Sequence, residues 1–118
     1  MKMLFMLLAI FALCACEDRN TPNQDTDEYY VKYSIKSSGV YLYFSDIVYA
    51  DVYGNNYAER GHSVKSWTVT IGPVKKGFRA AVKNTQGTGN NIIEVSKNGG
   101  PFAQKATGTN SASYTINF

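Results

Sequence analysis

The sequence predicts an all-β domain, an antiparallel β-sandwich of about seven strands. From residue 29 to residue 118, apolar and polar residues alternate, which is the period of a strand with one buried face. Glycine, asparagine and serine interrupt this alternation about every eight to twelve residues, as turns do in sandwiches. No stretch of this region has helical periodicity. We therefore expect residues 29–118 to form a single domain of two packed sheets.

Two long strands are expected in the first half of the domain. Residues 29–37 place three apolar side chains on one face, those of Val31, Tyr33 and Ile35. The second strand covers residues 40–52, and its alternation slips at Ser45-Asp46, which indicates a β-bulge. Residues 57–63 are polar and fit either a loop or a weak edge strand.

The second half contains the remaining strands. Residues 64–71 form a strand with Trp67 facing inward, which Gly72-Pro73 ends. Residues 78–84 follow, and their alternation turns three side chains outward, those of Arg79, Ala81 and Lys83. Residues 85–91 are expected to be a flexible loop, and residues 112–118 a closing strand after a turn at 108–111.

A hairpin is expected near the end of the domain. Its strands cover residues 92–97 and 102–107 and flank Asn98-Gly99-Gly100. Asn-Gly favours the tight turn in which both central residues have positive φ. This dipeptide therefore gives the strongest local prediction in the domain.

The first sixteen residues have the parts of a secretory signal. Lys2 supplies a positive charge, Met3 to Leu13 are apolar, and the small residue Ala15 precedes Cys16. Leu13-Cys14-Ala15-Cys16 resembles a bacterial lipobox, and this resemblance implies cleavage after Ala15 and a lipid on the Cys16 sulfur. A membrane-spanning helix and ordinary secretion are the alternatives. A helix of Met3–Ala15 would span only ~20 Å of a bilayer core of roughly 30 Å.

The lipid anchor would be followed by an acidic spacer. Residues 17–28 contain no aliphatic or aromatic residue, so we expect them to be a disordered tether. They carry five acidic residues against one arginine, whereas residues 29–118 carry ten basic residues against four acidic ones. Both cysteines lie in the first sixteen residues, so the domain is expected to have no disulfide. Glu17-Asp18 also resembles the surface-export signal of Bacteroidetes-type lipoproteins.

Several motifs of the domain resemble a known family. In order, they are Val31-Lys32-Tyr33, Ile47-Val48-Tyr49-Ala50-Asp51, Gly54-Asn55, Trp67, Val74-Lys75-Lys76-Gly77-Phe78 and Asn98-Gly99. They resemble the MmpS-like family, named after the mycobacterial membrane protein small proteins. The resemblance implies an immunoglobulin- or transthyretin-like sandwich and a role as accessory to RND-type exporters. The chain departs from the family in lacking Leu-Pro before Trp67 and in having Asn98-Gly99 where Asp-Gly is common.

No catalytic constellation is recognisable, and we expect neither an enzyme nor a cofactor or metal. The single histidine, His62, lies in a polar segment. Asp46 and Asp51 would face opposite sides of a regular strand, which disfavours a pair of catalytic carboxylates. Calcium at Asp51–Asn56 is an alternative to an ordinary polar turn. The basic residues are scattered, and nucleic acid is not expected as a partner.

Tyrosine is the one enriched residue type, with nine in 118 residues. Amphipathic rings on an exposed sheet can contact sugars or a protein partner, although tyrosine also favours strands and cores. The candidate binding surface comprises six residues, Tyr30, Tyr41, Tyr43, Tyr49, Tyr53 and Tyr57. The expected function is that of a lipid-anchored envelope protein, in the outer membrane or at the cell surface, that binds a protein or glycan. The alternative is an accessory or structural subunit of an RND-type transporter.

Overall fold

A computed structural model describes residues 26–37, 43–60 and 64–118. The predicted signal peptide (residues 1–15), Cys16, most of the predicted tether, Tyr41 and His62 lie outside the described residues. Within the described ranges the structure contains strands and no helix.

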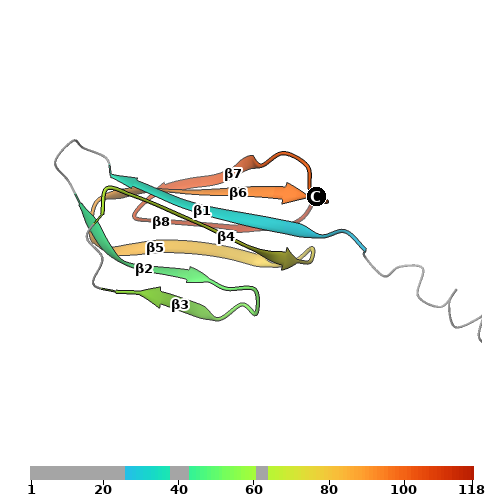
Figure 1. Cartoon of the computed structure of the whole chain (residues 1–118), viewed down its shortest axis with the longest axis horizontal. Helices are drawn as coiled ribbons and strands as arrows, with labels where there is room; N and C mark the ends of the chain where they lie inside the picture. Colours follow the sequence, from blue (N-terminus) through green and yellow to red (C-terminus); the bar gives the residue numbers. More distant parts are fainter. Residues whose placement is uncertain (1–25, 38–42, 61–63) are drawn as a thin grey trace, which may run out of the picture.

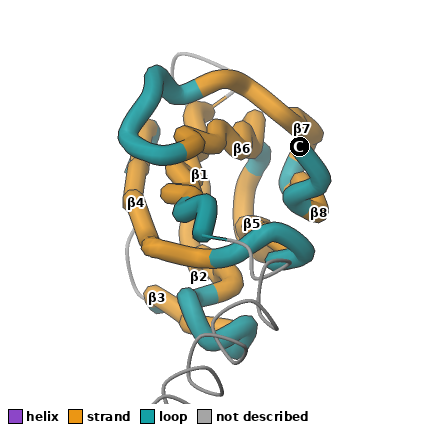
Figure 2. The backbone as a smooth tube through the Cα atoms, turned by 90° about the vertical axis from the view of Figure 1, so that its right-hand side faces the viewer, coloured by secondary structure: helices purple, strands orange, loops and turns teal. Residues whose placement is uncertain are grey.

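Eight strands form two antiparallel four-stranded sheets that pack face to face (Figures 1 and 2). We call them sheet A, with the order β4-β1-β6-β7, and sheet B, with the order β3-β2-β5-β8. The strands are β1 (Tyr29–Ser37), β2 (Phe44–Ala50), β3 (Asn56–Glu59), β4 (Ser66–Val74), β5 (Arg79–Gly87), β6 (Gly89–Lys97), β7 (Ala103–Thr109) and β8 (Ser111–Thr115). The predicted sandwich is therefore confirmed, with eight strands instead of about seven. The additional strand is β3, which forms an edge of sheet B in the polar segment.

The core lies between the sheets and follows from the alternation of the strands. Each strand turns every second residue inward, and the inward residues of β1 are apolar. The completely buried residues include Val31, Tyr33 and Ile35 on β1, and Ile93 on β6. Trp67, Val69 and Ile71 of β4 are half-buried and pack against this core, as the alternation predicted.

The predicted hairpin is confirmed. Antiparallel β6 and β7 flank the turn, and Val95 pairs with Ala103. Asn98 and Gly99 have φ angles of 53° and 76°. The backbone N–H of Gly100 donates to the Lys97 carbonyl oxygen at 3.0 Å and closes the turn. The conformation is the one that Asn-Gly favours.

The predicted bulge in β2 is a different irregularity. Asp46 has a φ angle of 55°, and this single residue interrupts the alternation, so that Phe44 and Ile47 are both buried. The pairing with β5 keeps one register on both sides of Asp46, because Ser45 pairs with Gln86 and Ile47 with Asn84. No extra residue is inserted, so the slip reflects a local backbone turn.

Gly72-Pro73 does not end the strand that contains Trp67. β4 continues to Val74, which pairs with Tyr29, and the register shifts by one residue between this pair and the Val31–Ile71 pair. Proline lacks an N–H, but it is tolerated on an edge strand, where one side of the backbone has no partner strand. β4 is such an edge. The sequence alone did not place the strand at an edge.

Residues 85–91 are not a flexible loop, because β5 extends to Gly87 and β6 begins at Gly89. Three asparagine side chains hold this connection together. The Asn84 Nδ2 donates to the carbonyl oxygens of Gln86 and Gly87 and to the Asn110 Oδ1, at 3.1, 3.2 and 3.2 Å. The Asn91 Nδ2 donates to the Asn84 Oδ1 at 3.0 Å, and the Asn91 side chain is completely buried. Polar residues that suggest a loop in the sequence therefore form hydrogen bonds with one another in the structure, and among the described residues the only buried side-chain polar atom without a hydrogen-bond partner is the Asn91 Oδ1.

The end of the predicted tether is attached to the domain. The Lys97 Nζ lies 3.5 Å from an Asp27 carboxylate oxygen. The Asn98 Nδ2 donates to the Asp27 Oδ1 at 2.9 Å, and the Asn98 N–H donates to the Glu28 carbonyl oxygen at 2.7 Å. The ordered domain thus begins at least two residues before Tyr29. The chain enters at the end of the sandwich where Phe118 also lies (Figure 1).

Candidate ligand-binding surface

A groove of about 500 Å³ crosses the outer face of sheet B. Residues from β2, β3, β5 and β8 line it, and one residue comes from β7. The lining residues are Val48, Tyr49, Asn56, Arg79, Ala81, Val82, Lys83, Thr107, Ser111, Ala112 and Ser113. Its volume is in the range of sites for small molecules or short segments of a polymer.

The alternation of β5 and β8 places the polar groups on this face. On β5, Arg79 and Lys83 are exposed and flank the half-buried Ala81, as the sequence predicted for this strand. On β8, Ser113 pairs with Ala81, and Ser111 pairs with Lys83. Small side chains at the centre leave a shallow floor between two long cationic ones.

Neither cation is neutralised within the described part of the chain. The side chains of Arg79 and Lys83 have no ion-pair or hydrogen-bond partner there, whereas Lys97 is paired with Asp27. The two residues lie four positions apart on one strand, which separates their Cα atoms by about 13 Å. The groove therefore carries two available positive charges along its length.

The described lining residues supply hydrogen-bonding groups but no catalytic set. They include three hydroxyls and one amide, those of Thr107, Ser111, Ser113 and Asn56. They include no carboxylate, histidine or cysteine that could activate a serine as a nucleophile. The arrangement can hold a polar, negatively charged ligand by ionic and hydrogen bonds.

Four aromatic rings cluster on the side of β2 that faces away from the groove, and the half-exposed Tyr57 of the edge strand β3 is one of them. The Tyr49 ring centroid lies 5.5 Å from that of Tyr33, 5.3 Å from that of Tyr57 and 5.5 Å from that of Trp67. Tyr49 is only 8% exposed. Its ring thus belongs to the core and is not exposed on the surface, although the residue contributes to the lining of the groove.

Burial changes the acidity of two of these phenols. It raises the pKa of Tyr33 to about 12, because desolvation disfavours the charged phenolate. It also raises the pKa of Tyr49, and the Glu59 carboxylate adds to this effect by charge repulsion. Both side chains are therefore neutral phenols at physiological pH.

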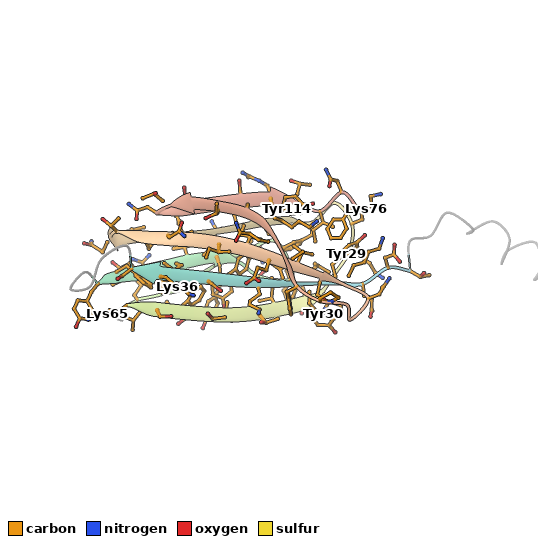
Figure 3. The ribbon with its side chains drawn as sticks, turned by 90° about the horizontal axis from the view of Figure 1, so that it is seen from above. Tyr29, Tyr30, Lys36, Lys65, Lys76 and Tyr114 are labelled. Atoms are coloured by element: carbon orange, nitrogen blue, oxygen red, sulfur yellow. The ribbon has the colours of Figure 1, made fainter. Side chains whose placement is uncertain are left out.

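The other described tyrosines of the predicted surface do not form one patch. Tyr30 is on β1 in sheet A, beside Gly72 of β4. Tyr43 precedes β2 and its ring lies 5.2 Å from the Lys65 Nζ. In Figure 3, Tyr30 and Lys65 are at opposite ends of the sandwich. Tyr53 and Tyr57, 83% and 51% exposed, lie in and after the turn between β2 and β3.

The acidic residue of the turn after β2 forms hydrogen bonds with the backbone of the turn. The Asp51 Oδ1 accepts the backbone N–H groups of Tyr53 and Asn55, at 3.0 and 2.9 Å. Among the residues that the structure describes, no three histidine, cysteine, aspartate or glutamate side chains are placed to share a metal ion. The described part of the chain also lacks a helix of the length and hydropathy needed to cross a bilayer.

The sequence did not predict the groove, although it predicted the outward orientation of three residues that line it. The alternation predicted that Arg79, Ala81 and Lys83 face outward, but outward residues occur on every strand. The groove exists because β8 pairs with β5 and places Ser111 and Ser113 beside them. This pairing joins segments about 30 residues apart, and no local pattern encodes it.

In comparisons with known proteins, no family model, curated protein or solved structure matches this chain. The resemblance to a bacterial lipobox and to the MmpS-like family stays a prediction from the sequence.

Proposed function

We propose that the chain is a lipid-anchored protein of the bacterial cell envelope that acts by binding, and that the outer face of sheet B is its contact surface. The observation that carries the binding function is the groove itself. It combines a floor of small residues with two cations and two serine hydroxyls that have no partner among the residues that the structure describes. The partner classes remain those expected from the sequence, a glycan or a protein.

The N-terminal sequence supports the anchor. Leu13-Cys14-Ala15-Cys16 has the order of a lipobox, and the segment after it joins the domain at Asp27. This junction is at an end of the sandwich (Figure 1), whereas the groove is lined mainly by residues of sheet B. A domain held by its N-terminus would therefore keep the groove accessible. Lipidation with more than one acyl chain would hold it durably on a membrane.

Two cysteine variants test the anchor. We expect the wild-type protein to remain in the membrane fraction after a high-salt wash and to leave it in detergent. Cys16→Ala should release the protein from the membrane, while Cys14→Ala should leave it bound, because only Cys16 follows a small residue. Equal behaviour of the two variants would contradict lipidation at Cys16.

Protease accessibility then tests the location. Digestion by proteinase K on intact cells of the native host would place the domain at the cell surface, which supports a contact with external glycans or proteins. Protection until lysis would place it in the periplasm. In that case, cross-linking followed by purification of a membrane complex tests the alternative, an accessory subunit of a transporter. Turnover of an envelope polymer by the purified protein would contradict the binding proposal.

A further inference from the structure

We infer that the groove on sheet B binds an acidic oligosaccharide, a sugar chain that bears carboxylate or sulfate groups. This inference rests on the proposed function, because it names the ligand class of the same surface. Three features carry it: the charges of the groove, its hydrogen-bonding groups and its position on the face of a sheet.

The charges select a ligand with repeated negative groups. Arg79 and Lys83 stand on one strand with about 13 Å between their Cα atoms. Neither has an ion-pair partner among the described residues, and no lining residue is acidic. One small anion would reach one of these cations. An extended chain with several anionic groups can reach both.

The remaining polar groups match a ligand rich in hydroxyls. The side chains of Asn56, Ser111 and Ser113 are exposed and have no hydrogen-bond partner in the described part of the chain. An amide and a hydroxyl can each donate and accept, as can each sugar hydroxyl. The groove can therefore form hydrogen bonds between its two cationic positions.

The position of the groove disfavours a peptide. Extended peptides bind sheets mainly by adding a strand at an edge, where backbone groups are free. The groove also reaches the edge strands β3 and β8, but β5, which contributes the largest share of its lining, is an interior strand whose two neighbours are β2 and β8. Its ladders use the backbone groups on both sides. Along β5, side chains are thus the main groups offered to a ligand, and they suit a glycan better than a polypeptide.

Calorimetric titration of the full-length protein, purified from membranes in a neutral detergent, tests the inference. The probes are an oligogalacturonate, the same oligosaccharide with its carboxylates methyl-esterified, a heparin-derived sulfated oligosaccharide and a polyaspartate peptide. We expect binding of at least one acidic oligosaccharide, weaker binding at higher salt, and little binding of the esterified one or of polyaspartate.

Charge-removing variants locate the binding. Arg79→Gln and Lys83→Gln should each weaken it about five- to tenfold, since each removes a charge-assisted hydrogen bond. The matched control is Lys36→Gln, which removes one exposed charge from β1. Lys36 belongs to sheet A and not to sheet B, and it is labelled in Figure 3. This control should bind as the wild type does. Circular dichroism checks that each variant is folded.

Each of the following outcomes would overturn the inference of an acidic oligosaccharide ligand. None of them bears on the lipid anchor, which the cysteine variants test separately. Equal binding of the esterified and free oligogalacturonate would leave a glycan-binding function but remove the acidic requirement. If polyaspartate bound as tightly as the acidic sugars, the groove would recognise negative charge alone and not the sugar. Equal loss in Lys36→Gln and Arg79→Gln would exclude the groove. Failure of both acidic oligosaccharides to bind would reject the ligand class.

Discussion

The Tyr33 hydroxyl on β1 donates a hydrogen bond to the backbone carbonyl oxygen of Ala50 on β2, at 2.9 Å. This bond links sheet A to sheet B inside the core, where the Tyr33 side chain is completely buried. The same hydroxyl accepts the backbone N–H of Ala81 on β5, at 3.4 Å. One phenol therefore connects three strands, and one of them lies under the floor of the groove.

Removing this hydroxyl should destabilise the fold. We expect Tyr33→Phe to lower the free energy of unfolding by about 1–2 kcal/mol, because the buried partners lose a hydrogen bond. The matched control is Tyr57→Phe, since the exposed Tyr57 hydroxyl has no partner among the described residues. The control should change the free energy by less than about 0.5 kcal/mol. Urea unfolding followed by the fluorescence of Trp67, the single tryptophan, measures both; equal effects would contradict the role of Tyr33.

The stability should also fall at alkaline pH. Burial raises the pKa of Tyr33 from 10.0 in the unfolded chain to about 12 in the folded protein. Between these values the unfolded state has lost the proton and the folded state retains it, so the unfolded state binds fewer protons and stability falls as pH rises. The stabilisation that comes from the raised pKa of Tyr33 is fully present below pH 10 and is lost as the pH rises towards 12.

Tyr33→Phe supplies the control for this pH dependence. The urea midpoint of the wild type should fall more steeply above about pH 10 than that of the variant. Burial also raises the pKa of Tyr49, so the Tyr33→Phe variant should retain part of the pH dependence of stability. Parallel pH profiles of wild type and variant would show that Tyr33 does not titrate as expected.

The asparagine cluster should be a major source of stability. Asn84→Ala removes three donated hydrogen bonds and leaves the buried Asn91 amide without its Asn84 acceptor. We expect a loss of about 2–4 kcal/mol. The control is Asn90→Ala on β6, which should cost less than about 1 kcal/mol. Within the described residues, the exposed Asn90 side chain forms one hydrogen bond, which it accepts from the Thr107 hydroxyl. A comparable loss from Asn90→Ala in urea unfolding would argue against the cluster.

Two glycines with the same φ angle allow the cost of backbone strain to be compared with the cost of steric crowding. Gly87 and Gly99 both have a φ angle of 76°. A Cβ at Gly99 would meet nothing within 4 Å, whereas one at Gly87 would overlap the Tyr43 carbonyl oxygen. Gly99→Ala should therefore cost about 1–2 kcal/mol, from the left-handed backbone alone.

Gly87→Ala should cost more than about 3 kcal/mol, because the backbone of Tyr43 must also move. The difference in stability between the Gly87→Ala and Gly99→Ala variants, measured by thermal unfolding, gives the energetic effect of the close approach between Gly87 and the Tyr43 backbone. Equal melting temperatures would mean that the start of β2 adjusts freely to the added methyl group.

The sequence by itself determined the features that depend on neighbouring residues. The alternation in residues 29–37 and 78–84 identified which side chains face inward, because successive strand residues point to opposite sides. Asn98-Gly99 determined a hairpin turn, because these two residues tolerate positive φ. The two-sheet class followed from the same local patterns.

The tertiary structure decided what depends on segments far apart in the chain. The sequence could not tell that Tyr49 is covered by Tyr33, Tyr57 and Trp67, since burial depends on the packing of other strands. Nor could it tell that Asn84 forms hydrogen bonds with Asn91 and Asn110 where a loop was expected. Ser113 lies beside Ala81 only because β8 pairs with β5. The groove is a product of long-range pairing, and local periodicity carries no information on which strands become neighbours.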